Sequence, residues 1–163
     1  MRSTNVLILL LFLLMSSICV ADDGTVKTVG SIKAVEGTAF IIRNGDRLSA
    51  SAGHRLFEND LLQTGQDGSM GVILKDDTVL SLGPDSAIVI DEFVFSPEDG
   101  QLSIVTKMLR GTVSYISGKI SKLSPESARF QTPVATIGIR GTHFLVKVMD
   151  EEESQQNAGD EPE

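Results

Sequence analysis

Two histidines are the side chains in this sequence whose chemistry would be easiest to recognise. His54 and His143 lie far apart, and neither stands at metal-ligand spacing from a second histidine or a cysteine. His54 belongs to a polar turn, so we predict that it lies in a loop. His143 has the opposite strand parity to Phe144 and Val146, so we predict that it faces outward. The sequence has no serine-nucleophile elbow, zinc-protease helix or phosphate-binding loop. We therefore predict a non-enzyme without catalytic residues, metal or cofactor.

Adjacent acidic residues offer a second kind of chemistry. Asp76-Asp77 and Asp91-Glu92 supply the carboxylate oxygens that calcium prefers, and two carboxylates across a cleft can form an acid–base couple. Nothing in the sequence shows that either pair converges on a cleft. Asp76-Asp77 stands between two apolar runs, where aspartates commonly form a tight turn, so we predict a turn there in preference to a metal site.

The charge balance argues against nucleic acid as a partner. The chain has 14 basic and 22 acidic residues, and it lacks the runs of Lys and Arg that neutralise phosphates. Gly138-Ile139-Arg140-Gly141 matches the Gly-x-x-Gly loop of one RNA-binding fold, but its surroundings favour strands over helices. Aromatic platforms for sugars are also scarce, because the chain has no tryptophan and one tyrosine.

The first 21 residues resemble a secretory signal peptide. Arg2 precedes the apolar run 6–15, and small residues follow it up to Ala21, where we predict cleavage and export to the periplasm. The apolar run is shorter than the roughly 20 residues of a membrane span, so we predict no span after cleavage. Cys19 leaves open an acylated lipoprotein, although Ile18 before it is larger than that signal normally has.

The remaining chain divides into one domain and a tail. Residues 22–149 are enough for a single domain with its own core. Residues 150–163 contain seven acids and no base, so we predict a disordered acidic tail. Without Cys19, the mature chain would have no cysteine and no disulfide.

Short β-branched runs, punctuated by Gly, Asn, Asp and Pro, predict an all-β domain of antiparallel strands and hairpins. Asn44-Gly45 predicts a two-residue hairpin turn, and a second hairpin is expected across Arg110-Gly111. Residues 119–127 are ambiguous, and within them Ser124-Pro125-Glu126 suits a turn or a single helical turn. Residues 43–49 and 75–81 resemble each other at an offset of 32, so a β-roll or solenoid and a sandwich both remain open. The expected strands cover residues 26–35, 38–43, 48 onward, 56–64, 70–74, 79–82, 87–95, 102–109, 112–117 and 129–131.

The stretch 132–146 shows a change of strand parity. Apolar residues stand at odd positions up to Ile139, starting with Ala135, and at even positions from Phe144 onward. Because strand side chains alternate between faces, a bend at Arg140-Gly141 would let both sets reach the core. Arg140 would then either contact a partner or brace the bend by hydrogen-bonding unpaired carbonyls, and we favour bracing.

This stretch resembles the signature that closes the FecR domain, a family named for the regulator of iron-dicitrate transport. Earlier segments also fit in order: Gly30 to Gly37, Glu58-Asn59-Asp60 before a strand, 76–86, and Leu109-Arg110-Gly111. The resemblance covers most of residues 30–148. The signature residues, which would serve structure or partner contact, are Thr132, Pro133, Gly138, Arg140, Gly141 and Thr142.

The resemblance implies an all-β periplasmic module for protein contact or signal sensing, without catalysis. Regulators of this family that act on sigma factors carry a cytoplasmic segment and a membrane helix before the exported domain, and this sequence has neither, so we expect a stand-alone module. Its expected partner is an unidentified envelope protein. Two alternatives are an envelope polysaccharide-binding protein or glycan-acting enzyme, and a lipid-anchored structural component of the envelope.

Overall fold

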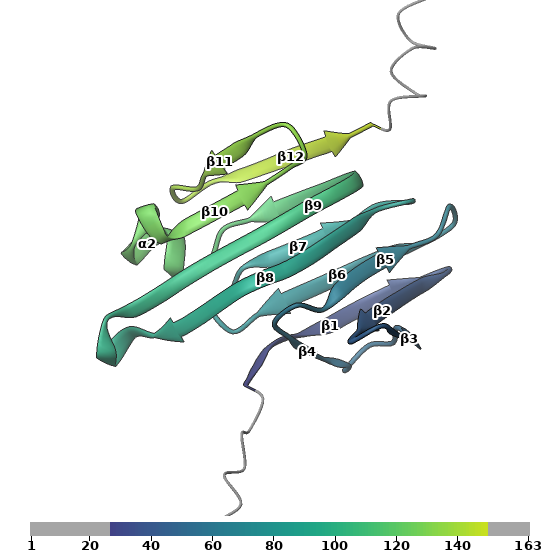
Figure 1. Ribbon diagram of the computed structural model, residues 1–163, viewed down its shortest axis with the longest axis horizontal. Helices are drawn as coiled ribbons and strands as arrows, with labels where there is room; N and C mark the ends of the chain where they lie inside the picture. Colours follow the sequence, from purple (N-terminus) through teal and green to yellow (C-terminus); the bar gives the residue numbers. More distant parts are fainter. Residues whose placement is uncertain (1–26, 150–163) are drawn as a thin grey trace, which may run out of the picture.

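The computed structural model describes residues 27–149 as twelve β-strands, a four-residue helix and two short 3₁₀ turns (Figure 1). The first six strands are β1 (Thr28–Glu36), β2 (Ala39–Arg43), β3 (Asp46–Ser49), β4 (Arg55–Phe57), β5 (Leu61–Thr64) and β6 (Ser69–Leu74). The others are β7 (Val79–Leu82), β8 (Ala87–Ser96), β9 (Gln101–Ile116), β10 (Ala128–Gln131), β11 (Thr136–Gly138) and β12 (His143–Val148). The all-β prediction is confirmed. The predicted signal peptide 1–21 and acidic tail 150–163 lie outside the described residues.

The twelve strands form one curled sheet whose two halves share the long strand β9. The first half has the order β4-β1-β6-β7-β9-β12, and the second half has the order β3-β2-β5-β8-β9, followed by β10 and β11. Figure 1 shows these halves as two layers, with β9 crossing the molecule between them. The structure therefore resembles the sandwich alternative, and the two similar hairpins, β2–β3 and β6–β7, belong to different halves.

The bend of β9 at Gly111 explains why one strand serves both halves. Residues 101–110 pair with β8, whereas 113–116 pair with β7. Gly111 has φ +89°, and an added Cβ would lie 2.4 Å from Cα and Oγ of Ser86. Ser86 Oγ donates to the carbonyl of Thr112 and accepts its N–H, both at 2.9 Å. The hairpin predicted across Arg110-Gly111 is thus wrong, because the left-handed glycine turns the strand toward the other layer without reversing it.

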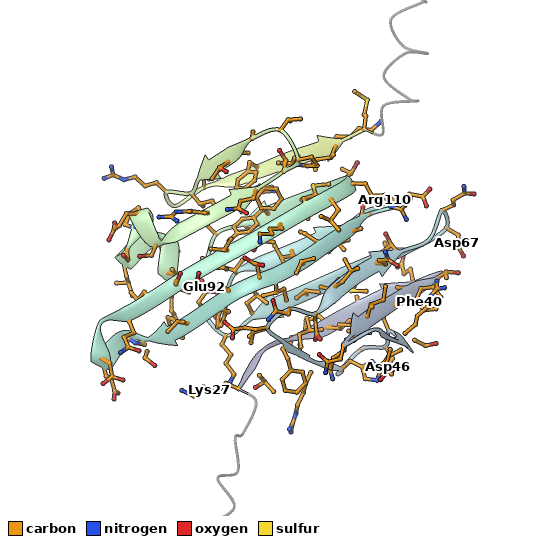
Figure 2. All side chains as sticks on the ribbon, in the orientation of Figure 1. Lys27, Phe40, Asp46, Asp67, Glu92 and Arg110 are labelled. Carbon is orange, nitrogen blue, oxygen red and sulfur yellow. The ribbon has the colours of Figure 1, made fainter. Side chains whose placement is uncertain are left out.

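Two buried rows of side chains face each other across the layers. Each row consists of residues that lie directly opposite one another on neighbouring strands. The residues before and after each of them along its own strand belong to the outer face of the sheet. The first row contains Ile32, Val72, Leu80, Tyr115 and Phe144; the second contains Ile41, Leu62, Ile88 and Met108. All except Phe144, which is half-buried, are at most 1% exposed. Figure 2 shows the side chains of the described residues on the ribbon. This packing gives the domain one continuous core.

Local turn chemistry follows the sequence closely. Asn44 and Gly45, with φ +52° and +91°, form the predicted two-residue turn between β2 and β3. After β9, the chain forms the short helix α2 (Ile120–Leu123), and the turn predicted at Ser124-Pro125-Glu126 is present as the 3₁₀ turn η2 (Pro125–Ser127). These turns bring the chain back to β10, which pairs parallel with the first half of β9. The expectation of antiparallel pairing fails at this one pair of strands.

Candidate functional site

The signature stretch begins with a tight hairpin turn between β10 and β11. The N–H of Thr132 donates to the carbonyl of Ala135 at 2.8 Å, and the N–H of Ala135 donates to Thr132 Oγ1 at 3.0 Å. Pro133 and Val134 occupy the two central positions, where the fixed φ of proline suits the first. Val134 is 93% exposed at the tip. The turn therefore presents an apolar side chain to solvent.

The second part of the signature carries the chain from one half of the sheet to the other. Ile139 is 1% exposed, and its N–H donates to the carbonyl of Ala128 at 3.0 Å. Gly141, at φ +52°, turns the chain, and the N–H of Thr142 donates to Ser117 Oγ at 2.7 Å. The predicted bend at Arg140-Gly141 is confirmed, as a crossing between layers.

Most, but not all, of the apolar residues on either side of this crossing reach the core as predicted. Ile137, Phe144, Val146 and Val148 pack against the core, but Ala135 is exposed, contrary to the parity prediction. The reason is that Ala135 closes the hairpin turn, where strand alternation no longer applies.

Three aromatic rings pack together next to the crossing. Phe144 stacks on Tyr115, with ring centroids 5.0 Å apart. Phe130 meets both rings edge-on, at 5.7 Å from Tyr115 and 5.6 Å from Phe144.

Arg140 is exposed, and its side chain makes no hydrogen bond or ion pair with residues 27–149. The prediction that Arg140 braces the bend is therefore wrong. The bend needs no arginine, because the N–H groups of Ile139 and Thr142 on either side already make the hydrogen bonds that fix it. Gly138, also in the signature, has no atom within 4 Å of an added Cβ. The structure leaves Arg140 available for contact with another molecule.

Asp76 is a fully buried carboxylate that joins the β6–β7 turn to the start of α2. Its Oδ1 accepts the N–H of Thr78 at 3.1 Å, and its Oδ2 accepts the Thr78 hydroxyl at 2.8 Å and the N–H of Ile120 at 3.3 Å. The N–H of Gly118 donates to Thr78 Oγ1 at 3.1 Å. Asp77, exposed and at φ +68°, pairs with Lys119 at 2.8 Å. The predicted turn is confirmed, and Asp76 has a structural role that its position in the sequence did not reveal.

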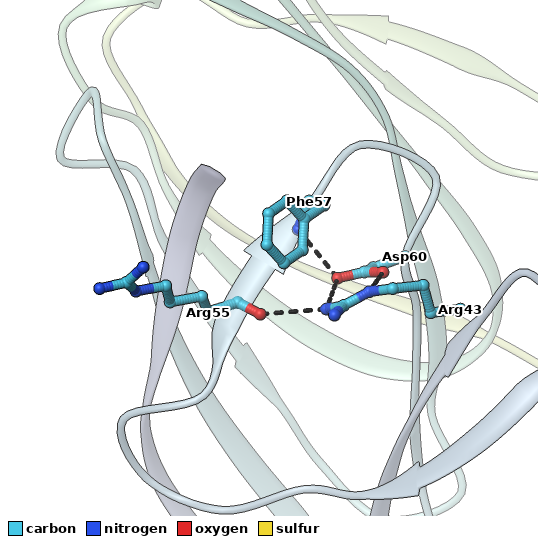
Figure 3. Close-up of polar contacts among 4 residues, drawn as sticks. All are labelled: Arg43, Arg55, Phe57 and Asp60. Carbon is cyan, nitrogen blue, oxygen red and sulfur yellow. Dashed lines mark hydrogen bonds and ion pairs between the residues drawn. The ribbon is translucent and has the colours of Figure 1, made fainter. Parts of the chain in front are cut away.

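Asp60 is the other fully buried carboxylate, and it organises the turn that precedes β5 (Figure 3). Arg43 donates two hydrogen bonds to it, at 2.7 and 2.8 Å, and a third to the carbonyl of Arg55 at 3.1 Å. The N–H of Phe57 donates to Asp60 at 2.8 Å, and the Phe57 ring lies 4.3 Å below the guanidinium of Arg43. The bond to Asp60 raises the pKa of Arg43. Asn59, at φ +65°, adopts the backbone conformation that glycine favours.

The fold brings one serine next to a histidine, a combination that can act as nucleophile and general base. Ser114 Oγ and His143 Nε2 lie 2.9 Å apart, on neighbouring strands β9 and β12. Catalysis would also need a group to orient the imidazole and donors for an oxyanion. Within residues 27–149 no carboxylate bonds to His143, which is exposed as predicted. His54 lies in the loop before β4, as predicted, and is exposed. Strand parity indicated that His143 faces outward, but its contact with Ser114 depends on the pairing of β12 with β9, which the sequence did not predict.

The part of the chain that the structure describes offers few features that could bind a metal ion or a small molecule. No group of three metal-ligating side chains occurs within it, and no helix there is long and apolar enough to span a membrane. A hollow of about 230 Å³ lies between the start of β1 and the end of β8, with Lys27, Glu58 and Lys75 in its lining. Glu58 already accepts the N–H of Phe93 at 2.6 Å, so its carboxylate serves the fold.

The geometry defines a two-layered all-β domain whose buried carboxylates hold turns and whose signature residues close one side of the sandwich. Residues 60–158 match the FecR protein family, and because this is more than half of the chain, the chain belongs to that family. The match covers β5 to β12 and extends past them, whereas the sequence resemblance was expected from residue 30. No curated protein and no solved structure matches the chain. The family is one of signal-sensing regulatory proteins.

Proposed function

We propose that this chain is a non-catalytic protein-interaction module that senses a signal in the periplasm by binding another envelope protein. Membership of the FecR family supports a regulatory role. The predicted signal peptide, 1–21, supports export. Because the domain has no catalytic constellation on its described surface, its output would be a change in what it binds.

One observation carries this proposal: the signature stretch uses its buried groups for structure and leaves Val134 and Arg140 projecting. Val134 is 93% exposed at the hairpin tip, and Arg140 is exposed at the crossing between layers. The hydrogen bonds made by Thr132 and Thr142 fix the backbone that carries these two side chains. Arginine is enriched among the residues that dominate binding at protein interfaces, and the exposed valine offers apolar surface that a partner could bury.

The experiment is affinity capture from the cell envelope. Full-length protein with an affinity tag is expressed in its own host, cross-linked in the periplasm and purified, and the captured proteins are compared with those of an Arg140→Ala, Val134→Ser double variant of equal abundance. The proposal expects a defined envelope protein that the wild type enriches and the variant does not. Enrichment of the same proteins by both forms would contradict the assigned surface. No enrichment by either would contradict the function.

Localisation has its own measurement. Mass spectrometry of the purified mature protein is expected to give an N-terminus at Asp22, released by periplasmic fractionation. An acylated N-terminus at Cys19 would instead identify a lipoprotein, and a chain with intact Met1 in the cytoplasm would contradict export.

A further inference from the structure

We propose that the free edge of β12 accepts an extended segment of the partner as an added strand, and that this segment alternates apolar and acidic residues. The proposal rests on the proposed function and deepens it, because it names the surface and the chemistry of the partner. It does not depend on the hairpin tip.

The hydrogen-bond pattern shows which groups of β12 face outward. β12 pairs with β9 from His143↔Ile116 to Val148↔Gly111, and within residues 27–149 no strand pairs with its other side. The N–H of Ser117 donates to the carbonyl of Thr142 at 3.0 Å, which fixes the phase of the alternation. In an antiparallel pair, every second residue directs its N–H and C=O toward the neighbour. Phe144 and Val146 therefore bond to β9, and the backbone groups of His143 and Leu145 point away from it.

β12 is the longest edge strand of the curled sheet within residues 27–149. The other edge strands, β3, β4 and β11, have four, three and three residues, whereas β12 has six. Short length, proline and charged side chains, lysine above all, commonly protect natural edges from pairing. β12 contains no proline, and its lysine, Lys147, stands next to its C-terminal end. Its length suits the addition of a strand of five or six residues.

The side chains of β12 are incompletely covered on both faces. On the core face, Phe144, Val146 and Val148 are only half-buried, although they pack on the core. On the outer face, Leu145 is 69% exposed. A strand added beside β12 would place alternate apolar side chains against the half-buried row.

Charge determines the other half of the partner's pattern. Residues 128–149 contain Arg129, Arg140, Lys147 and His143 and no acidic residue. β7 and the adjoining half of β9 (residues 111–116) contain no acidic residue either. Acidic side chains on the outer face of an added strand would therefore meet no acidic side chain on β7, β12 or residues 111–116, and the charged residues of 128–149 are all basic. A second copy of this chain would bring the same basic edge, so we assign the site to a different, acidic partner.

The test is a titration with a defined probe. A ten-residue peptide that alternates valine and glutamate is titrated into the full-length protein, with a peptide that alternates valine and lysine and a block peptide of the first composition as comparisons. We expect saturable binding of the alternating acidic peptide, at least about tenfold tighter than either comparison. Equal binding of the block peptide, or no binding, would overturn the proposal.

Variants decide whether the edge is the site. Leu145→Pro removes an N–H that points outward, and it should weaken binding by about tenfold or more while the melting temperature stays close to that of the wild type. Leu145→Thr keeps that N–H and is expected to retain most of the affinity. His143→Pro removes the neighbouring outward N–H and replaces Leu145→Pro if that variant unfolds. Unchanged binding by a folded proline variant would overturn the proposal.

The remaining outcomes name other occupants. A concentration-dependent dimer that Leu145→Pro dissociates would assign the edge to a second copy and overturn the proposal. Peptide binding that appears only after the seven acids of 150–163 are changed to amides would assign the edge to the chain's own terminus, and this result would overturn the proposal too. If the envelope protein is captured equally by wild-type and Leu145→Pro protein, the interaction function stands and the edge proposal falls.

Discussion

The guanidinium of Arg43 holds the fully buried carboxylate of Asp60 through two hydrogen bonds of 2.7 and 2.8 Å. The two residues are far apart in the chain, on β2 and in the turn before β5, and their contact fixes that turn against the sheet. Because the side chain of Arg43 is 31% exposed, solvent screens part of the attraction.

Arg43→Ala should lower the free energy of unfolding by about 2–4 kcal/mol, because it leaves a buried carboxylate with the Phe57 N–H as its remaining donor. Urea denaturation measures this loss. Lys107→Ala is the control, since its ion pair with Asp91 is partly exposed to solvent and should contribute less than about 1 kcal/mol. Equal losses in the two variants would show that the pair at Asp60 has no special role.

Gly118→Ala should destabilise the domain by about 1–3 kcal/mol, because an added Cβ would lie 2.3 Å from the carbonyl oxygen of Asp76 and 2.4 Å from the nitrogen of Thr78. Gly138→Ala is the matched control: it adds the same methyl group where no atom lies within 4 Å. Thermal unfolding of the two variants should separate a packing glycine from a signature glycine that tolerates a side chain. A large loss in Gly138→Ala would indicate a structural role that the packing does not show.

Asp76→Ala should cost about 3 kcal/mol or more, because it leaves three buried donors on Thr78 and Ile120 without their acceptor. Asp77→Ala should change stability little, because its pair with Lys119 is exposed. Denaturation midpoints of the two neighbouring variants give the comparison. Similar midpoints would contradict the buried network.

Tyr115→Phe should leave the domain equally stable or more stable. The Tyr115 hydroxyl is buried and has no hydrogen-bond partner among the described residues, so its removal relieves an unpaired polar group. Burial also raises the pKa of Tyr115 above its ordinary value of 10.0. A raised folded-state pKa gives stability that is complete below the ordinary value and lost as the pH rises beyond it.

Wild-type stability should therefore fall more steeply above about pH 10 than that of Tyr115→Phe. The chain has one tyrosine, so tyrosinate absorbance should appear only with unfolding. Tyrosinate formation in the folded protein near its ordinary pKa would show that the hydroxyl reaches solvent.

Arg140→Ala should leave the melting temperature within about one degree of the wild type, because the side chain makes no bond to residues 27–149. The same variant should weaken capture of the envelope partner. Thermal unfolding and affinity capture are measured on one preparation. A loss of several degrees with unchanged capture would restore the bracing role.

The sequence by itself determined the local features of this protein. β-branched runs between turn residues predicted the strands, Asn44-Gly45 predicted its hairpin, and the parity change after Ile139 predicted a bend. Each of these depends on neighbours in the chain: alternation with period 2 and the positive φ that Gly, Asn and Asp tolerate. The same local chemistry supported the FecR family.

The tertiary structure decided everything that depends on distant partners. Gly111 looked like a hairpin turn, and only its contact with Ser86 makes it the bend of a strand shared by two layers. Asp76 and Asp77 are alike in sequence, yet one is buried beneath α2 and the other is exposed. The exposed arginine of the signature and the unpaired edge of β12 likewise follow from which strands become neighbours. Strand order is set by burial summed over the whole chain, so residue types within one segment do not specify it.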